Sequence, residues 1–231
     1  MSVAGRGDPA HLLAMSPFDP SQANEIVFPP AVRQAQERLG SRRKGEHLET
    51  KGRFVRPISE DVAQFIALRD SVFLATAGPG GRPYIQHRGG PPGFLKLLDD
   101  HTIGFADFRG NRQYITVGNL AENDQAFLFL ADYTAQARVK LWGRARVVDD
   151  DPALLQRLAV PGYDAVVERA ILFTIEAWDE NCDQHIPQLV HVDEVVQHLV
   201  TAKARIEALE AEVARLTAEK TAATRDPDSP A

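Results

Sequence analysis

The sequence predicts a mainly β protein with flanking helices, built as a small six-stranded antiparallel barrel and followed by a separate C-terminal helix. The first observation is a series of short apolar or alternating runs bounded by Gly and Pro, which is typical of strands. The second is that only short helical segments separate these runs, and closure into a barrel would remove exposed strand edges. The expected strands are residues 71–77, 82–88, 102–108, 125–133, 137–150 and 170–178.

The first two strands form a hairpin signal, because SVFLATA at 71–77 and RPYIQHR at 82–88 flank the turn sequence GPGG. The run 137–150 predicts a longer strand with two different faces. Its apolar face carries Val139, Leu141, Gly143, Ala145 and Val147, and its other face carries Arg138, Lys140, Trp142, Arg144 and Arg146. We expect Arg144 and Arg146 to face the solvent, whereas adjacent strands could bring Arg138 or Lys140 near Arg88 and Arg112.

The helical segments around these strands are short. A helix is expected over residues 31–39, and another over 59–69 with Ser59 as its N-cap and acidic residues in its first turn. A third is expected over 111–123. A fourth over 151–159 has Pro152 at a favourable first position.

The C-terminal segment has a different pattern. From Val195 its apolar residues recur in alternating steps of four and three, which predicts a coiled-coil-like seam. The seam consists of Leu199, Ala202, Ile206, Leu209, Val213 and Leu216. Arg205 and Glu210 stand where they could pair across a parallel dimer. The alternative is a helix that lies on its own domain.

These patterns divide the chain into four parts. Residues 1–55 form an N-terminal arm with a short helix, and residues 56–190 form the strand-rich domain. Residues 191–222 form the C-terminal helix, and residues 223–231 a tail.

Composition excludes several classes of protein. The 231 residues carry a formal net charge of −6, which is not typical of a protein that binds nucleic acid. Apolar stretches are too short for a membrane span, and the N-terminus lacks the apolar core of a secretory signal. We therefore expect a cytoplasmic protein with no nucleic-acid or membrane partner. The single cysteine, Cys182, excludes a disulfide within the chain.

Common catalytic and metal-binding signatures are absent. The sequence has no G-x-S-x-G elbow, no P-loop and no G-x-G-x-x-G fingerprint. His185 and His191 lie close in sequence, but two ligands are too few for a zinc site. We expect no metal and no catalytic residue supplied by the protein itself. Cys182 has acidic neighbours that would raise its pKa, which favours packing or pocket lining over a reactive thiol.

Two arginines beside Gly-rich breaks are the candidate anion ligands. Arg88 precedes the loop GGPPG, whose glycines would let backbone amides approach a ligand. An arginine fork there suits a phosphate or carboxylate, although a surface turn with a solvated arginine is an equal alternative. Asn111 and Arg112 follow Gly110 at the expected start of the helix 111–123, where free N–H groups favour an anion. An exposed first-turn arginine is the alternative there.

Three segments together resemble the pyridoxamine 5′-phosphate oxidase-like family of FMN-binding split barrels, in its flavin-nucleotide-binding branch. They are GRPYIQHRGGPPGF, IGFADFRGNRQYITVGNLAENDQAFLFL and ARVKLWGRARVV. The later segment WDENCDQHIPQ is similar to the tail that follows the barrel in this branch. The resemblance implies a six-stranded antiparallel split β-barrel and a homodimer that binds two FMN molecules in its interface.

The resemblance also implies the site residues. The cofactor-binding set is Gln86, His87, Arg88, Gly89, Asn111, Arg112, Gln113, Thr116, Arg138, Lys140, Trp178, Cys182 and His185. Arg88 and Arg112 would hold the FMN phosphate, and groups near His87 and Asp107 would face the ribityl chain or ring. Trp178, Cys182 and His185 would reach the flavin of the partner chain.

The function that the resemblance implies is an FMN-dependent oxidoreductase, which transfers electrons between NADH, NADPH or another donor and a small acceptor. The oxidase's C-terminal Arg/His substrate motif is absent, and a coiled-coil-like helix stands in its place, which disfavours vitamin B6 oxidation. The alternatives are a non-catalytic flavin or haem carrier or sensor, and an F420-dependent reductase on the same fold.

Overall fold

The computed structural model describes residues 22–55, 57–181 and 184–223. The chain divides into two compact units. One contains the described residues up to Asp132 together with 136–186, and the other contains 133–135 and the described residues from Pro187 onward.

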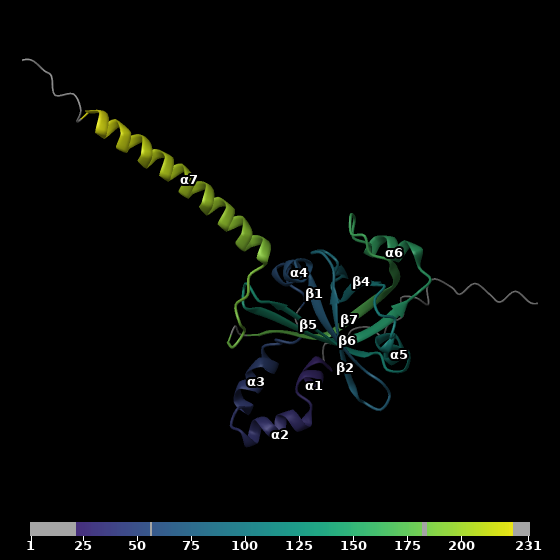
Figure 1. The fold of residues 1–231 in the computed structure, drawn as a ribbon. Coiled ribbons are helices and arrows are strands. Elements are labelled where there is room, and N and C mark those ends of the chain that lie inside the picture. The colour runs from purple at the N-terminus through teal and green to yellow at the C-terminus, as the bar shows by residue number, and fades with distance from the viewer. Residues whose placement is uncertain (1–21, 56, 182–183, 224–231) are drawn as a thin grey trace, which may run out of the picture. The chain divides into compact units, whose positions relative to one another are not determined.

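The first unit is built on one antiparallel sheet of seven strands (Figure 1). The strands are β1 (Ser71–Ala77), β2 (Pro83–Gly89), β3 (Lys96–Asp99), β4 (Thr102–Phe108), β5 (Gln125–Asp132), β6 (Ala137–Val148) and β7 (Val167–Asn181). Their order in the sheet is β2-β1-β5-β6-β7-β4-β3. The expected count of six strands is therefore wrong, and the order is that of an open sheet. The missed strand is β3, whose four residues begin soon after the Gly/Pro loop and are too few to show a period.

The alternation predicted for the strand 137–150 is confirmed in part. In β6, Val139, Leu141 and Ala145 are buried while Lys140 and Arg144 are only partly covered. The strand β7 begins and ends three residues outside the predicted range 170–178. Its pairing with β6 shifts register between Trp142 and Gly143, where a bulge bends the sheet.

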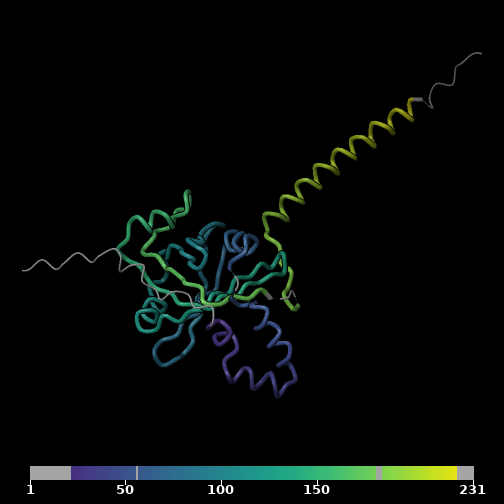
Figure 2. The backbone as a smooth tube through the Cα atoms, turned by 180° about the vertical axis from the view of Figure 1, so that it is seen from behind, coloured from purple at the N-terminus to yellow at the C-terminus, as the bar shows by residue number. Residues whose placement is uncertain are grey.

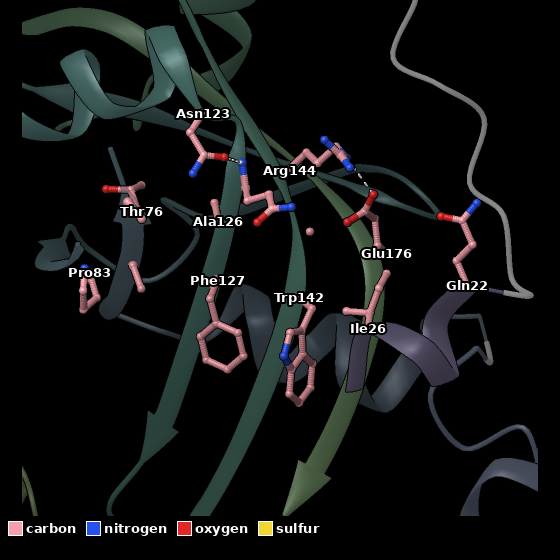
Figure 3. Close-up of a pocket in the computed structure, with 14 residues that line it drawn as sticks. Gln22, Ile26, Thr76, Pro83, Asn123, Ala126, Phe127, Trp142, Arg144 and Glu176 are labelled. Carbon is pink, nitrogen blue, oxygen red and sulfur yellow. Dashed lines mark hydrogen bonds and ion pairs between the residues drawn. The ribbon is translucent and has the colours of Figure 1, made fainter. Parts of the chain in front are cut away.

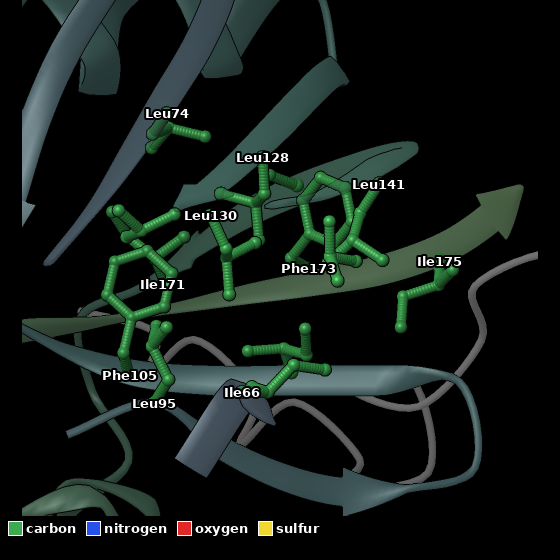
Figure 4. Packing of buried hydrophobic residues seen from close by; sticks show 14 of the residues in the cluster. Ile66, Leu74, Leu95, Phe105, Leu128, Leu130, Leu141, Ile171, Phe173 and Ile175 are labelled. Carbon is green, nitrogen blue, oxygen red and sulfur yellow. The ribbon is translucent and has the colours of Figure 1, made fainter. Parts of the chain in front are cut away.

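The main core lies on the inner face of this sheet (Figure 4). Leu74, Leu128 and Leu141 come from three adjacent strands and are fully buried. Phe105 from β4 and Phe173 from β7 complete the same cluster. Side chains at every second position of a strand share a face, so each strand contributes its apolar set to this core.

Four helices match or correct the sequence expectations around the sheet. Helix α4 (Glu60–Ala67) begins as predicted, with Ser59 Oγ accepting a hydrogen bond from the Val62 backbone N–H at 3.4 Å. Helix α6 (Pro152–Leu158) has Pro152 at its first position, also as predicted. Helix α2 (Pro30–Arg38) agrees with the expected 31–39. Helix α5 (Ile115–Glu122) starts four residues later than expected, which changes the interpretation of the site below.

The N-terminal segment holds more helix than the sequence indicates. Helices α1 (Ala23–Val27) and α3 (Arg42–Thr50) flank α2 (Figure 1). The basic residues after Gly40 belong to α3, where Arg42 pairs with Glu49. Ala23 and Phe54 are buried against Ala177 on the outer face of β7. These residues therefore anchor the segment to the sheet.

The second unit consists mainly of the helix α7 (Val192–Ala223), which is one continuous helix of 32 residues (Figure 2). The predicted C-terminal helix is confirmed, and every residue from 192 to 222 is exposed. None of the described helices has the length and apolar character needed to cross a membrane.

Candidate functional site

A small polar pocket lies where β2, β4, α5 and the start of β7 meet. Its volume is about 40 Å³. The lining residues are Gln86, Arg88, Asp107, Phe108, Gly110, Asn111, Arg112, Tyr114, Thr116, Val117 and Glu168. Five of them belong to the predicted cofactor-binding set, namely Gln86, Arg88, Asn111, Arg112 and Thr116. Strand β2 presents Gln86 and Arg88 to the same side because they are two positions apart.

An ion pair between Arg88 and Asp107 joins β2 to β4, two strands that are not neighbours in the sheet order. The Arg88 Nη1 donates to Asp107 Oδ1, and the two side chains are only 15% and 7% exposed. The Arg88 Nε is buried and has no hydrogen-bond partner within the described part of the chain. A buried guanidinium N–H without a partner is costly, so this N–H can donate a hydrogen bond to a ligand oxygen at little further cost.

A second contact between β2 and α5 shapes the neighbouring wall. The Thr116 hydroxyl donates to Gln86 Oε1 at 2.9 Å, and Thr116 is almost fully buried. The Gln86 amide N–H groups are not used in this bond. They supply neutral donors beside Arg88.

The loop before α5 holds Arg112 in an unusual backbone conformation. Arg112 has φ 58° and Tyr114 has φ 54°, both in the left-handed region that few residues with a side chain adopt. Such strain is typical of functional loops. Asn111 Oδ1 accepts a hydrogen bond from the Gln113 backbone N–H at 3.2 Å, which stabilises the turn.

The expectation that Asn111 and Arg112 lie at a helix N-terminus is wrong. Helix α5 begins at Ile115, and Tyr114 is its N-cap. The pattern at 111–114 resembles a helix start in sequence, but the left-handed residues Arg112 and Tyr114 interrupt it. An anion here would therefore depend on side chains rather than on the free N–H groups of a helix.

Arginines outnumber carboxylates around the pocket. Four guanidinium groups face three acids there, namely Arg88, Arg109, Arg112 and Arg169 with Asp107, Asp149 and Glu168. Arg109 Nε donates to Glu168 Oε1 at 2.8 Å, whereas Arg112 Nε lies 3.9 Å from the same oxygen. Arg112 is 56% exposed and makes the weakest contact with a carboxylate of the four arginines. The local excess of positive charge suits an anion although the whole chain is acidic.

The pKa values of the two acids that line the pocket, Asp107 and Glu168, are shifted in opposite directions. Burial raises the pKa of Asp107, and the charges of Arg88 and Arg169 only partly oppose this. The hydrogen bond from Arg109 lowers the pKa of Glu168. Asp107 is therefore the group whose ionisation the fold disfavours.

We expect the stability of the protein, relative to an Asp107→Asn variant, to increase as the pH falls through the raised pKa of Asp107. A carboxyl whose pKa is higher in the folded state takes up a proton on folding. Its contribution to stability is therefore greatest below its unfolded pKa, and is lost as the pH rises through its folded pKa. Urea unfolding at several pH values measures the difference. Two parallel curves would contradict the assignment.

The remaining predicted residues are not in this pocket. On β2 and in the loop, the His87 ring packs edge-on against Phe73 with centroids 5.6 Å apart, Gly89 pairs with Ser71, and Gln113 is exposed. On β6, Lys140 Nζ lies 3.4 Å from Asp179 Oδ2, and the Arg138 Nε is buried without a hydrogen-bond partner among the described residues. Their role in cofactor binding stays a prediction.

Two of the three residues expected to reach the flavin of a partner chain lie in the described part of the chain. Trp178 is buried in the main core. His185 is exposed and has φ 64°. Cys182 lies outside the described residues.

A larger hollow of about 460 Å³ lies over the outer face of the sheet (Figure 3). The rings of Phe127 and Trp142 meet edge to face at 5.0 Å and form its apolar wall. Arg144, interpreted from the sequence as solvent-facing, is 42% exposed and pairs with Glu176 at 2.8 Å and Asp124 at 2.7 Å. The wall of Phe127 and Trp142 can receive a flat apolar group. Arg144, however, already pairs with two acids, Asp124 and Glu176.

Sequence reasoning missed Arg109, Tyr114, Glu168 and Arg169. Glu168 and Arg169 lie on the first residues of β7, which the predicted strand 170–178 left out. The available signal was the sequence VERAILF, in which the charged residues Glu168 and Arg169 directly precede a continuous apolar run. Arg169 stacks over the Tyr114 ring at 4.9 Å and so supports the strained loop.

Taken together, these features define an antiparallel-sheet protein with an arginine-rich, anion-compatible pocket. A comparison with models of protein families matches residues 58–182 to the family described as Pyridoxamine 5'-phosphate oxidase. The match spans more than half of the 231 residues. The chain belongs to the pyridoxamine 5'-phosphate oxidase family, and the family expected from the sequence is confirmed.

Among solved structures, HupZ of Group A Streptococcus is 16% identical with a TM-score of 0.45, over 58% of this chain and 99% of that chain. An FMN-binding protein from Syntrophomonas wolfei is 18% identical with a TM-score of 0.43, over 66% and 99%. A protein from Clostridium acetobutylicum related to general stress protein 26 of B. subtilis is 19% identical with a TM-score of 0.41, over 58% and 94%. These likenesses are too distant to carry an argument about function. No curated protein matches this chain.

Proposed function

We propose that this chain is a homodimeric FMN-binding oxidoreductase, which holds the FMN phosphate in the pocket around Arg88. The observation that carries the proposal is the buried Arg88 Nε, which lacks a hydrogen-bond partner among the described residues and lies in a pocket surrounded by four arginines and three acids. A phosphate oxygen is a fitting partner for a guanidinium N–H.

The residues of the pocket fit a phosphate group better than a whole cofactor. A volume of about 40 Å³ has room for a few water-sized groups. The ribityl chain and ring of FMN would therefore lie outside the pocket, against the surface of this chain and a second copy. This size argument supports a dimer with the cofactor at its interface.

Each part of the pocket has a role in this proposal. Arg88 and Arg112 would bind the phosphate, and Gln86, Asn111 and Thr116 would hold the polar groups next to it. FMN, when bound, would supply the redox chemistry between a nicotinamide-type or other donor and a small acceptor. The protein would bind, orient and surround it, with no nucleophile of its own.

We expect Arg112→Ala to weaken FMN binding about tenfold, because it removes one charge-assisted hydrogen bond from an otherwise intact pocket. Arg112 is 56% exposed, so the fold should tolerate the change. Quenching of FMN fluorescence during titration gives the dissociation constant. Arg215→Ala is the matched control, since Arg215 is 55% exposed and lies on α7. Equal affinity of the Arg112 variant and the control would contradict the phosphate site.

The same purified protein separates the alternatives. Bound FMN that NADH or NADPH reduces under anaerobic conditions supports the oxidoreductase. Bound FMN that neither donor reduces favours a carrier or sensor. Preferential binding of haem or F420 in parallel titrations would replace FMN as the cofactor.

A further inference from the structure

Helix α7 carries an apolar seam that stays open to solvent along its length. The large apolar residues of the seam expose between 40% and 74% of their surface. They are Val192, Val195, Leu199, Ile206, Leu209, Val213 and Leu216. A long apolar stripe on an exposed helix is typical of a surface that packs against another helix.

The seam follows a heptad repeat over the whole helix. The a positions are Val192, Leu199, Ile206, Val213 and Lys220, and the d positions are Val195, Ala202, Leu209, Leu216 and Ala223. A strict heptad favours a coiled coil over a helix packed on a globular surface. The helix therefore suits a partner with the same repeat, and a second copy of α7 has one.

A parallel pair would match the residues poorly. Each residue of the seam would face the same residue of the second copy. Ala202 would therefore meet Ala202, and these two small side chains would leave the layer poorly packed. Lys220 would meet Lys220, which places two like charges together. Among the flanking positions, only Arg205 and Glu210 would attract each other across the pair.

An antiparallel pair that overlaps α7 over its full length matches the same residues well. Val192 then faces Ala223 of the second copy, and the seam is in register at every layer. Leu199 faces Leu216, Ala202 faces Val213, and Ile206 faces Leu209. Small residues meet larger ones, so the layers have similar volumes. Lys220 faces Val195 near the helix end, where its charged group can reach water.

The charges beside the seam favour the same orientation. In an antiparallel pair, g positions face g positions and e positions face e positions. Arg205 then faces Glu212 of the second copy, and Lys203 faces Glu210 of the second copy. Two-fold symmetry repeats each contact, which makes four attractive pairs where the parallel arrangement has two.

We propose that α7 binds α7 of a second copy in an antiparallel coiled coil, with the layer of Ile206 and Leu209 next to the two-fold axis. The overlap spans about 48 Å, from 32 residues at 1.5 Å each. The interface is independent of the flavin pocket, which lies in the other unit. It is therefore an additional contact between copies and does not depend on the proposed function.

Single-cysteine variants of the full chain test both pairing and orientation. In a Cys182→Ser background, Leu199→Cys and Leu216→Cys are each oxidised alone and as a mixture. We expect a disulfide-linked dimer, at twice the 25.5 kDa chain mass, only in the mixture, because Leu199 faces Leu216 of the second copy. Cross-linking of each variant alone would indicate a parallel pair and overturn the orientation. No cross-link in any sample would overturn the pairing itself.

A charge variant tests the same interface without cysteine chemistry. Glu212→Lys should weaken association through α7 at least tenfold, measured as the concentration dependence of mass, because it places a lysine against Arg205 of the second copy. In a parallel pair Glu212 would face Thr217, and the change would have little effect. Glu207→Lys is the control, since Glu207 lies one position after Ile206 and outside the seam. Both glutamates have a basic partner on their own helix.

Discussion

Arg88→Ala should abolish detectable FMN binding and lower the free energy of unfolding by about 3 kcal/mol. The loss of stability follows because Asp107, only 7% exposed, keeps its carboxyl in the interior without its partner on β2. The loss of binding follows because Arg88 supplies the buried guanidinium of the pocket. A dissociation constant from fluorescence quenching and a urea unfolding curve measure the two effects.

Two further variants separate the loss of binding from the loss of fold. Arg88→Met combined with Asp107→Leu removes both charges and keeps the volume, so we expect most of the stability to return while FMN binding stays absent. Arg69→Ala removes an arginine of similar exposure, 11%, from its 2.6 Å pair with Asp132. This control should cost stability without changing the affinity for FMN. Retention of FMN by the Arg88→Met, Asp107→Leu protein would end the phosphate assignment.

Gly143→Ala should prevent the sheet from forming in its present register, with a loss of more than about 4 kcal/mol or failure to give soluble protein. A Cβ atom at Gly143 would lie 2.0 Å from the Thr174 carbonyl oxygen and 2.9 Å from the Phe173 ring. A carbonyl oxygen on β7 cannot move aside as a flexible side chain would. The close approach occurs where the pairing of β6 and β7 shifts register.

The matched control is Gly118→Ala, which makes the same chemical change inside α5. A Cβ at Gly118 would meet nothing within 4 Å, and the residue is exposed. Because alanine favours the helical backbone, we expect a gain of about 0.5–1 kcal/mol. Thermal unfolding of the two variants measures the expected loss of stability in Gly143→Ala and the expected gain in Gly118→Ala. A folded Gly143→Ala protein with an unchanged melting temperature would contradict the packing at the bulge.

Some of the fold follows from local pattern. The alternation in 137–150 predicts which side chains of β6 are buried, because the period of a strand is two residues regardless of its surroundings. The cap at Ser59 and the start of α6 at Pro152 depend only on residues within one turn. Strand β3 could not be predicted in this way, since four residues show no period and their pairing with β4 is a contact between segments.

The candidate site likewise contains some residues that the local sequence predicts and others that only contacts between distant segments bring together. An arginine beside a Gly-rich loop is enough to predict Arg88 and Arg112 as candidate anion ligands. The residues that hold them in place are not predictable in this way. Asp107 reaches Arg88 from β4, and Glu168 on β7 lies 3.9 Å from Arg112.

The resemblance of three segments was thus sufficient for the family, and residue type and spacing were sufficient for the faces of β6 and for the C-terminal helix. The later start of α5, the partner of Arg88 and the absence of room for a β-carbon at Gly143 depend on how distant strands pack. The periods of strands and helices depend on residues close together in the chain, so the local sequence is enough to recognise them. Burial and close contact arise only when segments far apart in the chain meet, so only the tertiary structure decides them.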